Sequence, residues 1–103
     1  MDRITILKEM LAEDPADSFI WFAIAKEHEK TDPQTAIDTY LHLRSLDASY
    51  VGLYYHLGKM YELKGEKQLA IDTYSEGILV AKKQSDFHSI SELNNAKVNL
   101  EME

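Results

Sequence analysis

The sequence predicts an all-α domain of about six helices arranged as antiparallel helical hairpins. Three observations lead to this prediction. The five residues Ala36–Tyr40 recur unchanged as Ala70–Tyr74, 34 residues later, and a repeat of this period is typical of stacked helical hairpins. Apolar residues recur at the three- and four-residue spacing of a helix face, and no stretch alternates as a strand does. The 103 residues include only two prolines and four glycines, so few residues interrupt a helix.

Three helices are expected in the first half of the chain, over residues 3–13, 18–30 and 33–46. A helix ends before a proline because the residue preceding it is disfavoured in the helical conformation. A short polar side chain can accept a hydrogen bond from the first N–H groups of the next helix, and a proline at the first helical position loses no hydrogen bond. The breaks and caps expected on these grounds are Asp14-Pro15, Asp17 or Ser18, and Asp32-Pro33.

Three further helices are expected in the second half, over residues 51–61, 69–81 and 87–100. Gly65 lies in the turn between the first two of these and is free to adopt a positive φ. Lys82 and Lys83 would stand in the last turn of the fifth helix, where positive charges complement the helix dipole. Either Ser85 or Asp86 can cap the sixth helix. The short loops make neighbouring helices antiparallel.

The composition narrows the classes of function. A net charge of −7 disfavours general binding to nucleic-acid phosphates; it either favours a basic partner or only keeps the domain soluble. The absence of cysteine excludes disulfides and thiolate chemistry, and it fits the cytoplasmic location that we expect. We see no signal peptide and no apolar run of the roughly 20 residues that a membrane span needs. Neither nucleic acid nor a membrane is therefore expected as a partner.

The two hairpins resemble the tetratricopeptide repeat (TPR), whose signature is W-x-x-L-G-x-x-Y followed by A-x-x-x-F. The second hairpin carries this pattern as Tyr54-x-x-Leu57-Gly58-x-x-Tyr61 and Ala70-x-x-x-Tyr74. The first hairpin matches it with Trp21, Ala36 and Tyr40 and departs from it at Ile24, Ala25 and His28. A plain antiparallel helix bundle is the alternative.

The resemblance implies a single domain, residues 1–103, stacked as a short right-handed solenoid. Two full repeats, 18–50 and 51–84, would lie between an N-terminal half repeat, 1–17, and a C-terminal capping helix, 85–103. Small residues would then stand where helices cross closely, namely Ala25, Ala36, Gly58 and Ala70. Large residues would fill the space between the hairpins, namely Trp21, Tyr40, Tyr54 and Tyr74.

In proteins of this family, the first helix of each hairpin lines a concave groove that takes an extended peptide or a partner helix. The residues expected on that face here are Phe22, Lys26, Glu29, Tyr55, Lys59, Glu62, His88 and Glu92. Our hypothesis is an aromatic peptide groove in which the two lysines attract acidic groups, and the alternative is a solvated helix face. The carboxylate clamp of family members that bind chaperone C-termini is not expected, because Phe22 and Tyr55 stand where clamp lysines would be.

The sequence contains no P-loop, glycine-rich nucleotide turn or nucleophile motif. Its histidines lack the spacing of a zinc site, so no cofactor or metal is expected. We therefore predict a non-enzymatic adaptor that binds another protein, whose identity the sequence does not reveal. The alternative is a structural protein that forms a homodimer, through Phe19 or through the Leu93–Leu100 stripe.

Overall fold

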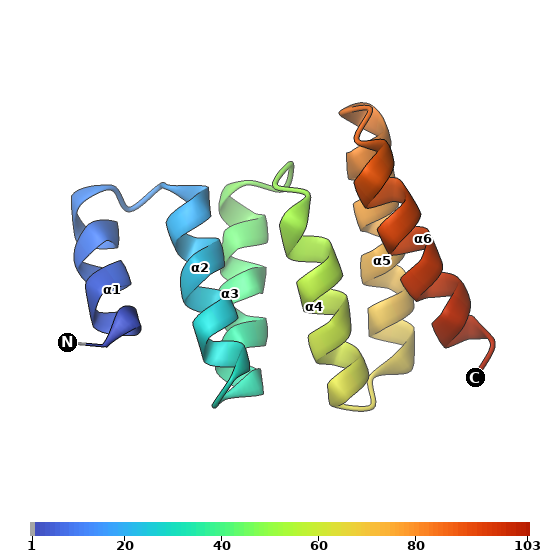
Figure 1. Ribbon diagram of the computed structural model, residues 1–103, viewed down its shortest axis with the longest axis horizontal. Coiled ribbons are helices and arrows are strands. Elements are labelled where there is room, and N and C mark those ends of the chain that lie inside the picture. The colour runs from blue at the N-terminus through green and yellow to red at the C-terminus, as the bar shows by residue number, and fades with distance from the viewer. Residues whose placement is uncertain (1) are drawn as a thin grey trace. The chain divides into compact units, whose positions relative to one another are not determined.

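The computed structural model describes residues 2–103, and this range contains six α-helices and no strand (Figure 1). The described residues form two compact units, the first ending at Tyr50 and the second spanning Val51–Glu103. The first unit contains α1 (Arg3–Glu13), α2 (Ser18–Glu29) and α3 (Pro33–Leu46). The second unit contains α4 (Gly52–Leu63), α5 (Lys67–Lys83) and α6 (Phe87–Glu101). Every helix expected from the sequence is present, and its ends lie within a turn of the expected ones.

Aspartate side chains cap four of the six described helices. Asp2, Asp17, Asp32 and Asp86 each accept a hydrogen bond from the backbone N–H three residues later. Asp17 is therefore the cap of α2 in place of Ser18, and Asp86 is the cap of α6 in place of Ser85. The caps satisfy N–H groups that have no partner within the helix.

Two turns after helices use a left-handed backbone conformation. Gly65 has φ 77°, as expected after α4, and Ser85 has φ 55° after α5, which the sequence did not indicate. In both turns, the next residue donates its backbone N–H to a carbonyl in the last turn of the preceding helix. Glu66 donates to the carbonyl of Tyr61, and Asp86 donates to the carbonyl of Ala81. These contacts form the same type of helix ending twice. Asp86 therefore closes α5 with its backbone and opens α6 with its side chain.

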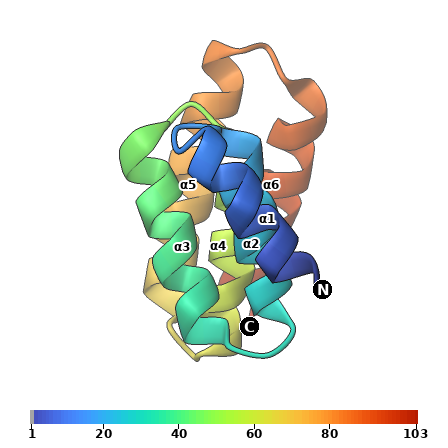
Figure 2. The same ribbon diagram turned by 90° about the vertical axis from the view of Figure 1, so that its left-hand side faces the viewer.

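The core of the first unit lies where α1 and α3 pack on α2 (Figure 2). Between α1 and α2, the buried side chains of Leu7, Ile20 and Ile24 meet around Ala23. On the other side, Ala25 and Ala36 are completely buried, as expected for small residues where α2 and α3 pack together.

The core of the second unit depends on two glycines. A Cβ atom added to Gly58 would lie 2.2 Å from the ring of Tyr74, and one added to Gly77 would lie 2.5 Å from Cβ of Tyr54. Gly58 confirms the expected small position on α4. Gly77 was not identified from the sequence, although it plays the same role on α5.

Helical spacing alone does not identify the buried side chains. Among the apolar residues at helical spacing, Leu46, Leu69, Leu79, Phe87 and Val98 are between 41% and 74% exposed. The Leu93–Leu100 stripe was considered for self-association, but Leu93 and Leu100 are buried within the chain. Helical periodicity gives the direction of an apolar face, whereas its buried width depends on the helices packed against it.

Candidate functional site

The first unit places an aromatic ring, a lysine, a glutamate and a buried tyrosine together. The ammonium nitrogen of Lys26 lies 5.5 Å from the centroid of the Phe22 ring, and the Phe22 ring lies 6.1 Å from the ring of Tyr40 on α3. The Tyr40 hydroxyl donates a hydrogen bond to the carboxylate of Glu29. Phe22, Lys26 and Glu29 are three or four residues apart on α2, which places them on one helix face.

The second unit repeats this set with one substitution. The ammonium nitrogen of Lys59 lies 5.4 Å from the centroid of the Tyr55 ring, and the Tyr55 ring lies 6.4 Å from that of Tyr74 on α5. The Tyr74 hydroxyl donates to the carboxylate of Glu62. Lys59 also forms an ion pair with Glu62 at 3.5 Å. We call Phe22 with Lys26 and Tyr55 with Lys59 the aromatic–lysine pairs.

The tyrosines and glutamates of the two sets support the scaffold. Burial raises the pKa of Tyr40 far above its ordinary value, and the adjacent Glu29 carboxylate raises it further. Burial and Glu62 raise the pKa of Tyr74 in the same way. Both phenols therefore stay protonated and donate to the glutamates. Both rings contact an aromatic ring of their own hairpin, whereas the resemblance implied that they fill the space between hairpins. Glu29 and Glu62 were predicted as groove residues, and the structure engages both with a tyrosine.

The two predicted site residues on α6 lie outside the two sets. His88 and Glu92 are both exposed, whereas the set around Tyr55 comes from α4 and α5. The structure therefore brings together six of the eight predicted residues as two sets of three, one in each unit.

The first unit also contains a pocket between α1 and α2, which we call the α1–α2 pocket. Its volume is about 300 Å³, and it is lined by Arg3, Phe19, Phe22, Ala23, Lys26, Glu27 and Lys30. Phe22 and Lys26 were predicted from the sequence as groove residues and Phe19 as a self-association residue, whereas the other four were not predicted as site residues. Because α1 and α2 are antiparallel, the start of α1 meets the end of α2, and residues 3 and 27 become neighbours. The opposite charges of Arg3 and Glu27 are the sequence signal that could have suggested this pocket, once α1 and α2 are known to be paired.

A metal-binding cluster and a membrane-spanning helix are both absent from the part of the chain that the structure describes. No cluster of three or more histidine, aspartate or glutamate side chains there is arranged to hold a metal ion. None of the helices in residues 2–103 is both long enough and apolar enough to cross a membrane.

The chain is similar to solved structures of TPR proteins. The solution structure of a TPR domain protein from Salinibacter ruber is 44% identical over 85% of this chain and 90% of that chain, with a TM-score of 0.81. A crystal structure of a TPR domain protein from the same organism is 42% identical over 82% of this chain and 97% of that chain, with a TM-score of 0.79.

A more distant structure shares the fold alone. It is the type III secretion translocator chaperone SycD of Yersinia enterocolitica, which is 13% identical over 96% of this chain and 70% of that chain, with a TM-score of 0.86. No protein-family model and no curated protein matches the sequence. The identity to the Salinibacter ruber protein, over nearly the full length of both chains, shows that this chain belongs to the tetratricopeptide repeat family.

Proposed function

We propose that the chain is a non-enzymatic, cytoplasmic protein-interaction module that binds a peptide or helix of a partner protein through its aromatic–lysine pairs. The observation that supports this most directly is the recurrence of the pairs at equivalent positions of the two units. Packing accounts for the repeated buried residues, such as Tyr40 and Tyr74. It does not require an incompletely buried ring with a lysine above it, and this combination is present in both units.

The chemistry of a pair suits a peptide ligand. The edge and face of an aromatic ring give a large contact area for an apolar side chain, and the ammonium group beside it attracts carboxylates. Membership of the TPR family supports the same function, because domains of this family commonly act by binding other proteins. The same fold also occurs in SycD, which is a type III secretion translocator chaperone.

The competing explanation is that each lysine lies over its ring only to cover it. An exposed cation–π contact is worth about 0.5–1 kcal/mol, which is enough to hold the side chain in this position without a ligand. The two explanations differ in what happens to ligand binding, and not to folding, when a pair is removed.

Peptides selected from a random library on the purified protein provide the test. We expect the double substitution Tyr55→Ala and Lys59→Ala to weaken binding of the selected peptides by at least about tenfold, measured by fluorescence anisotropy. The matched control is Phe87→Ala with Lys83→Ala, which removes an exposed ring and a lysine elsewhere in the second unit. Undiminished binding by a folded Tyr55/Lys59 variant, or equal weakening by the control, would refute the proposal.

Self-association is a second candidate, favoured by one observation. Phe19 is 62% exposed at the start of α2, and Ile6 and Met10 on α1 are nearly half exposed. A dimer could cover these side chains. Light scattering should then show twice the monomer mass, the melting temperature should rise with concentration, and Phe19→Ser should abolish both effects. A constant monomer mass across concentrations would exclude this candidate.

A further inference from the structure

We propose that the α1–α2 pocket binds an internal acidic segment of a partner protein, one that carries an aromatic or branched apolar side chain among its acidic residues. This inference rests on the proposed interaction function, and it specifies the ligand chemistry at the first aromatic–lysine pair. It depends on three properties of the pocket: its apolar floor, its excess of positive charge, and the state of Lys26.

The floor and one wall of the pocket are apolar. Ala23 is buried between α1 and α2, and its methyl group leaves space that a larger side chain would fill. Phe22 and the largely exposed ring of Phe19 border this space. A volume of about 300 Å³ accommodates one large ligand side chain and lies at the lower end of the range for ligand pockets.

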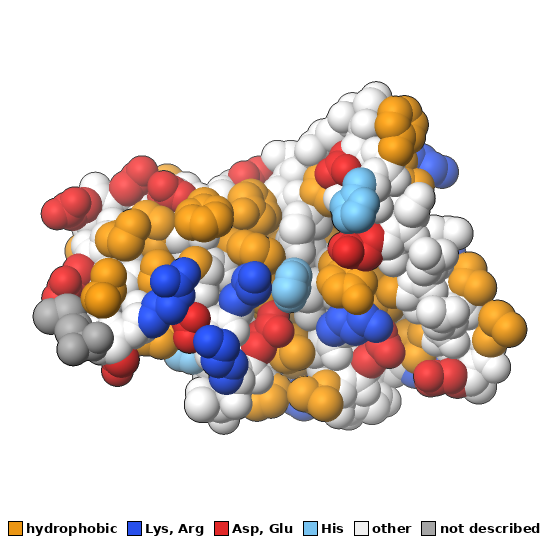
Figure 3. All heavy atoms as spheres, viewed as in Figure 1, with side chains coloured by type: hydrophobic (Ala, Val, Ile, Leu, Met, Phe, Trp, Pro, Cys, Tyr) orange, Lys and Arg blue, Asp and Glu red, His pale blue; other side chains and the backbone are white. Residues whose placement is uncertain are grey.

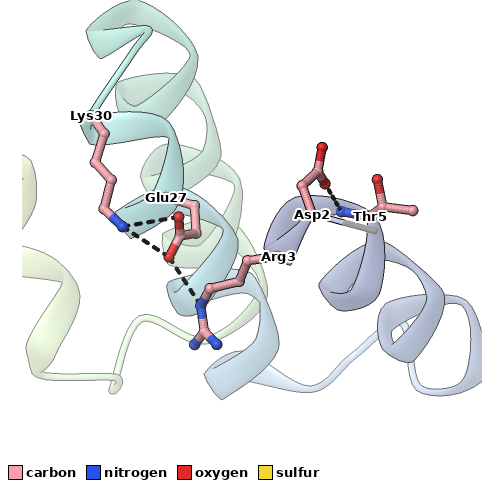
Figure 4. A network of polar contacts seen from close by, with 5 residues as sticks. All are labelled: Asp2, Arg3, Thr5, Glu27 and Lys30. Carbon is pink, nitrogen blue, oxygen red and sulfur yellow. Dashed lines mark hydrogen bonds and ion pairs between the residues drawn. The ribbon is translucent and has the colours of Figure 1, made fainter.

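The rim of the pocket is positively charged. Arg3, Lys26 and Lys30 line it together with a single carboxylate, Glu27. Glu27 contacts the Arg3 Nε atom at 2.9 Å and the Lys30 Nζ atom at 3.1 Å, so it is shared between two cations (Figure 4). The rim therefore keeps an excess of positive charge in a chain whose net charge is −7. Figure 3 shows basic side chains beside apolar ones over α2.

Lys26 is the rim cation that Glu27 does not engage. Its ammonium group lies over the Phe22 ring, and among the described residues no carboxylate forms an ion pair with it. The equivalent Lys59 in the second unit differs, because Glu62 lies 3.5 Å from it. Arg3 uses its Nε atom for Glu27, which leaves the other guanidinium donors for a ligand. A carboxylate near Lys26 and Arg3 would thus replace water without displacing an internal partner.

These properties favour a peptide over other anions. A ligand that satisfies both the rings and the cations must combine an apolar group with carboxylates within a few ångströms. Nucleic acid and anionic membranes present extended negative charge, which the net charge of the whole chain repels more strongly than it repels a short acidic segment. Binding of either one is therefore an outcome that the experiment must distinguish.

The experiment uses three fluorescein-labelled peptides with blocked ends, so that no terminal carboxylate contributes. The first has the core Asp-Glu-Phe-Glu-Asp, the second has lysine in place of every acidic residue, and the third has serine in place of phenylalanine. We expect the intact chain to bind the first peptide at least about tenfold more tightly than the other two, since a charge-assisted hydrogen bond and a buried ring each contribute that much.

Two charge reversals then locate the site. Lys26→Glu should weaken binding of the first peptide by about tenfold or more. Lys8→Glu makes the same change on the exposed surface of α1, outside the pocket, and should weaken binding by less than about twofold. Circular dichroism and thermal melting establish that both variants are folded.

Three results would overturn the inference: no binding of the acidic peptide at millimolar concentration, equal weakening by Lys26→Glu and Lys8→Glu, or Lys26-dependent binding of oligothymidine or phosphatidylserine vesicles in place of the peptide. Failure of this inference is separable from failure of the proposed function. Library-selected peptides that require Tyr55 and Lys59 but not Lys26 would preserve the interaction function and reject the ligand assigned to the pocket.

Discussion

Replacing Gly58 with alanine tests how closely α4 and α5 approach each other. A methyl carbon at this position would lie 2.2 Å from Cε1 of Tyr74 and 2.7 Å from two further atoms of the same ring. Carbon atoms in proteins normally approach to about 3.5–4.0 Å. The ring has no free space to move into, because Tyr74 is completely buried and its hydroxyl is bonded to Glu62.

The expected cost follows from three contributions. Inserting a methyl group into a packed core costs about 3 kcal/mol when a rigid ring must move. Displacing the Tyr74 hydroxyl from Glu62 adds about 1.5 kcal/mol, the lower value for a hydrogen bond to a charged group. Alanine recovers about 1 kcal/mol because glycine is a poor helix former. The net expectation is a loss of about 3.5 kcal/mol in the free energy of unfolding, or a fall of more than about 10 °C in melting temperature.

Urea unfolding followed by circular dichroism at 222 nm measures this loss. Gly52→Ala is the matched control, since Gly52 is an exposed residue in the first turn of the same helix. The control should be neutral or slightly stabilised, by up to about 1 kcal/mol. If Gly58→Ala were as stable as the control, the close approach of α4 to Tyr74 would not restrict this position and the reasoning would be wrong.

Three further predictions concern the polar contacts. Tyr40→Phe removes the donor to Glu29 and should lower the free energy of unfolding by about 1–3 kcal/mol in urea; an unchanged value would show that the contact is not stabilising. Burial raises the pKa of Tyr74 above its usual value of 10, so its contribution to stability should be complete below pH 10 and fall as pH rises further. The part of the tyrosine absorbance change at 295 nm that Tyr74→Phe removes should accompany unfolding, and its appearance before unfolding would contradict this expectation. Hydrogen bonds from Thr35 and Ser89 lower the pKa values of Asp32 and Asp86 below 3.8, so the contribution of these carboxylates to stability should be complete above about pH 4 and lost as pH falls below 3.8. Asp32→Asn still caps the helix but does not titrate in this range, so the melting temperature of this variant should fall less between pH 6 and pH 2. An unaltered pH dependence of the melting temperature would contradict this assignment.

Much of the candidate site could be predicted because it repeats along the chain. Phe22 and Lys26 on α2 correspond to Tyr55 and Lys59 on α4 at a constant offset, and the helix period places each pair on one face. The structure places each lysine over its ring. The role of Glu29 was harder to predict, because its tyrosine partner lies on the following helix and the contact depends on how the two helices are packed.

The α1–α2 pocket was not predictable for the same reason. Arg3 belongs to the first turn of α1, and no repeat or motif in the sequence connects it with Glu27. Their contact exists because two antiparallel helices of similar length bring the beginning of one beside the end of the other. Exposed apolar residues such as Phe87 show the converse, since a residue on an apolar stripe is buried only if another helix reaches it.

The sequence by itself determined the all-α class, the six helices, the Asp32 cap of α3 and the TPR family, because these depend on interactions among residues that are close in the chain. The tertiary structure decided which side chains meet across helices: Gly77 against Tyr54, Tyr40 with Glu29, and Arg3 with Glu27. Such contacts depend on the crossing and rotation of whole helices, which are set by the packing of many side chains at once. The repeated residues therefore indicate where the two units share a scaffold, whereas only the structure shows that Lys59 forms an ion pair with Glu62.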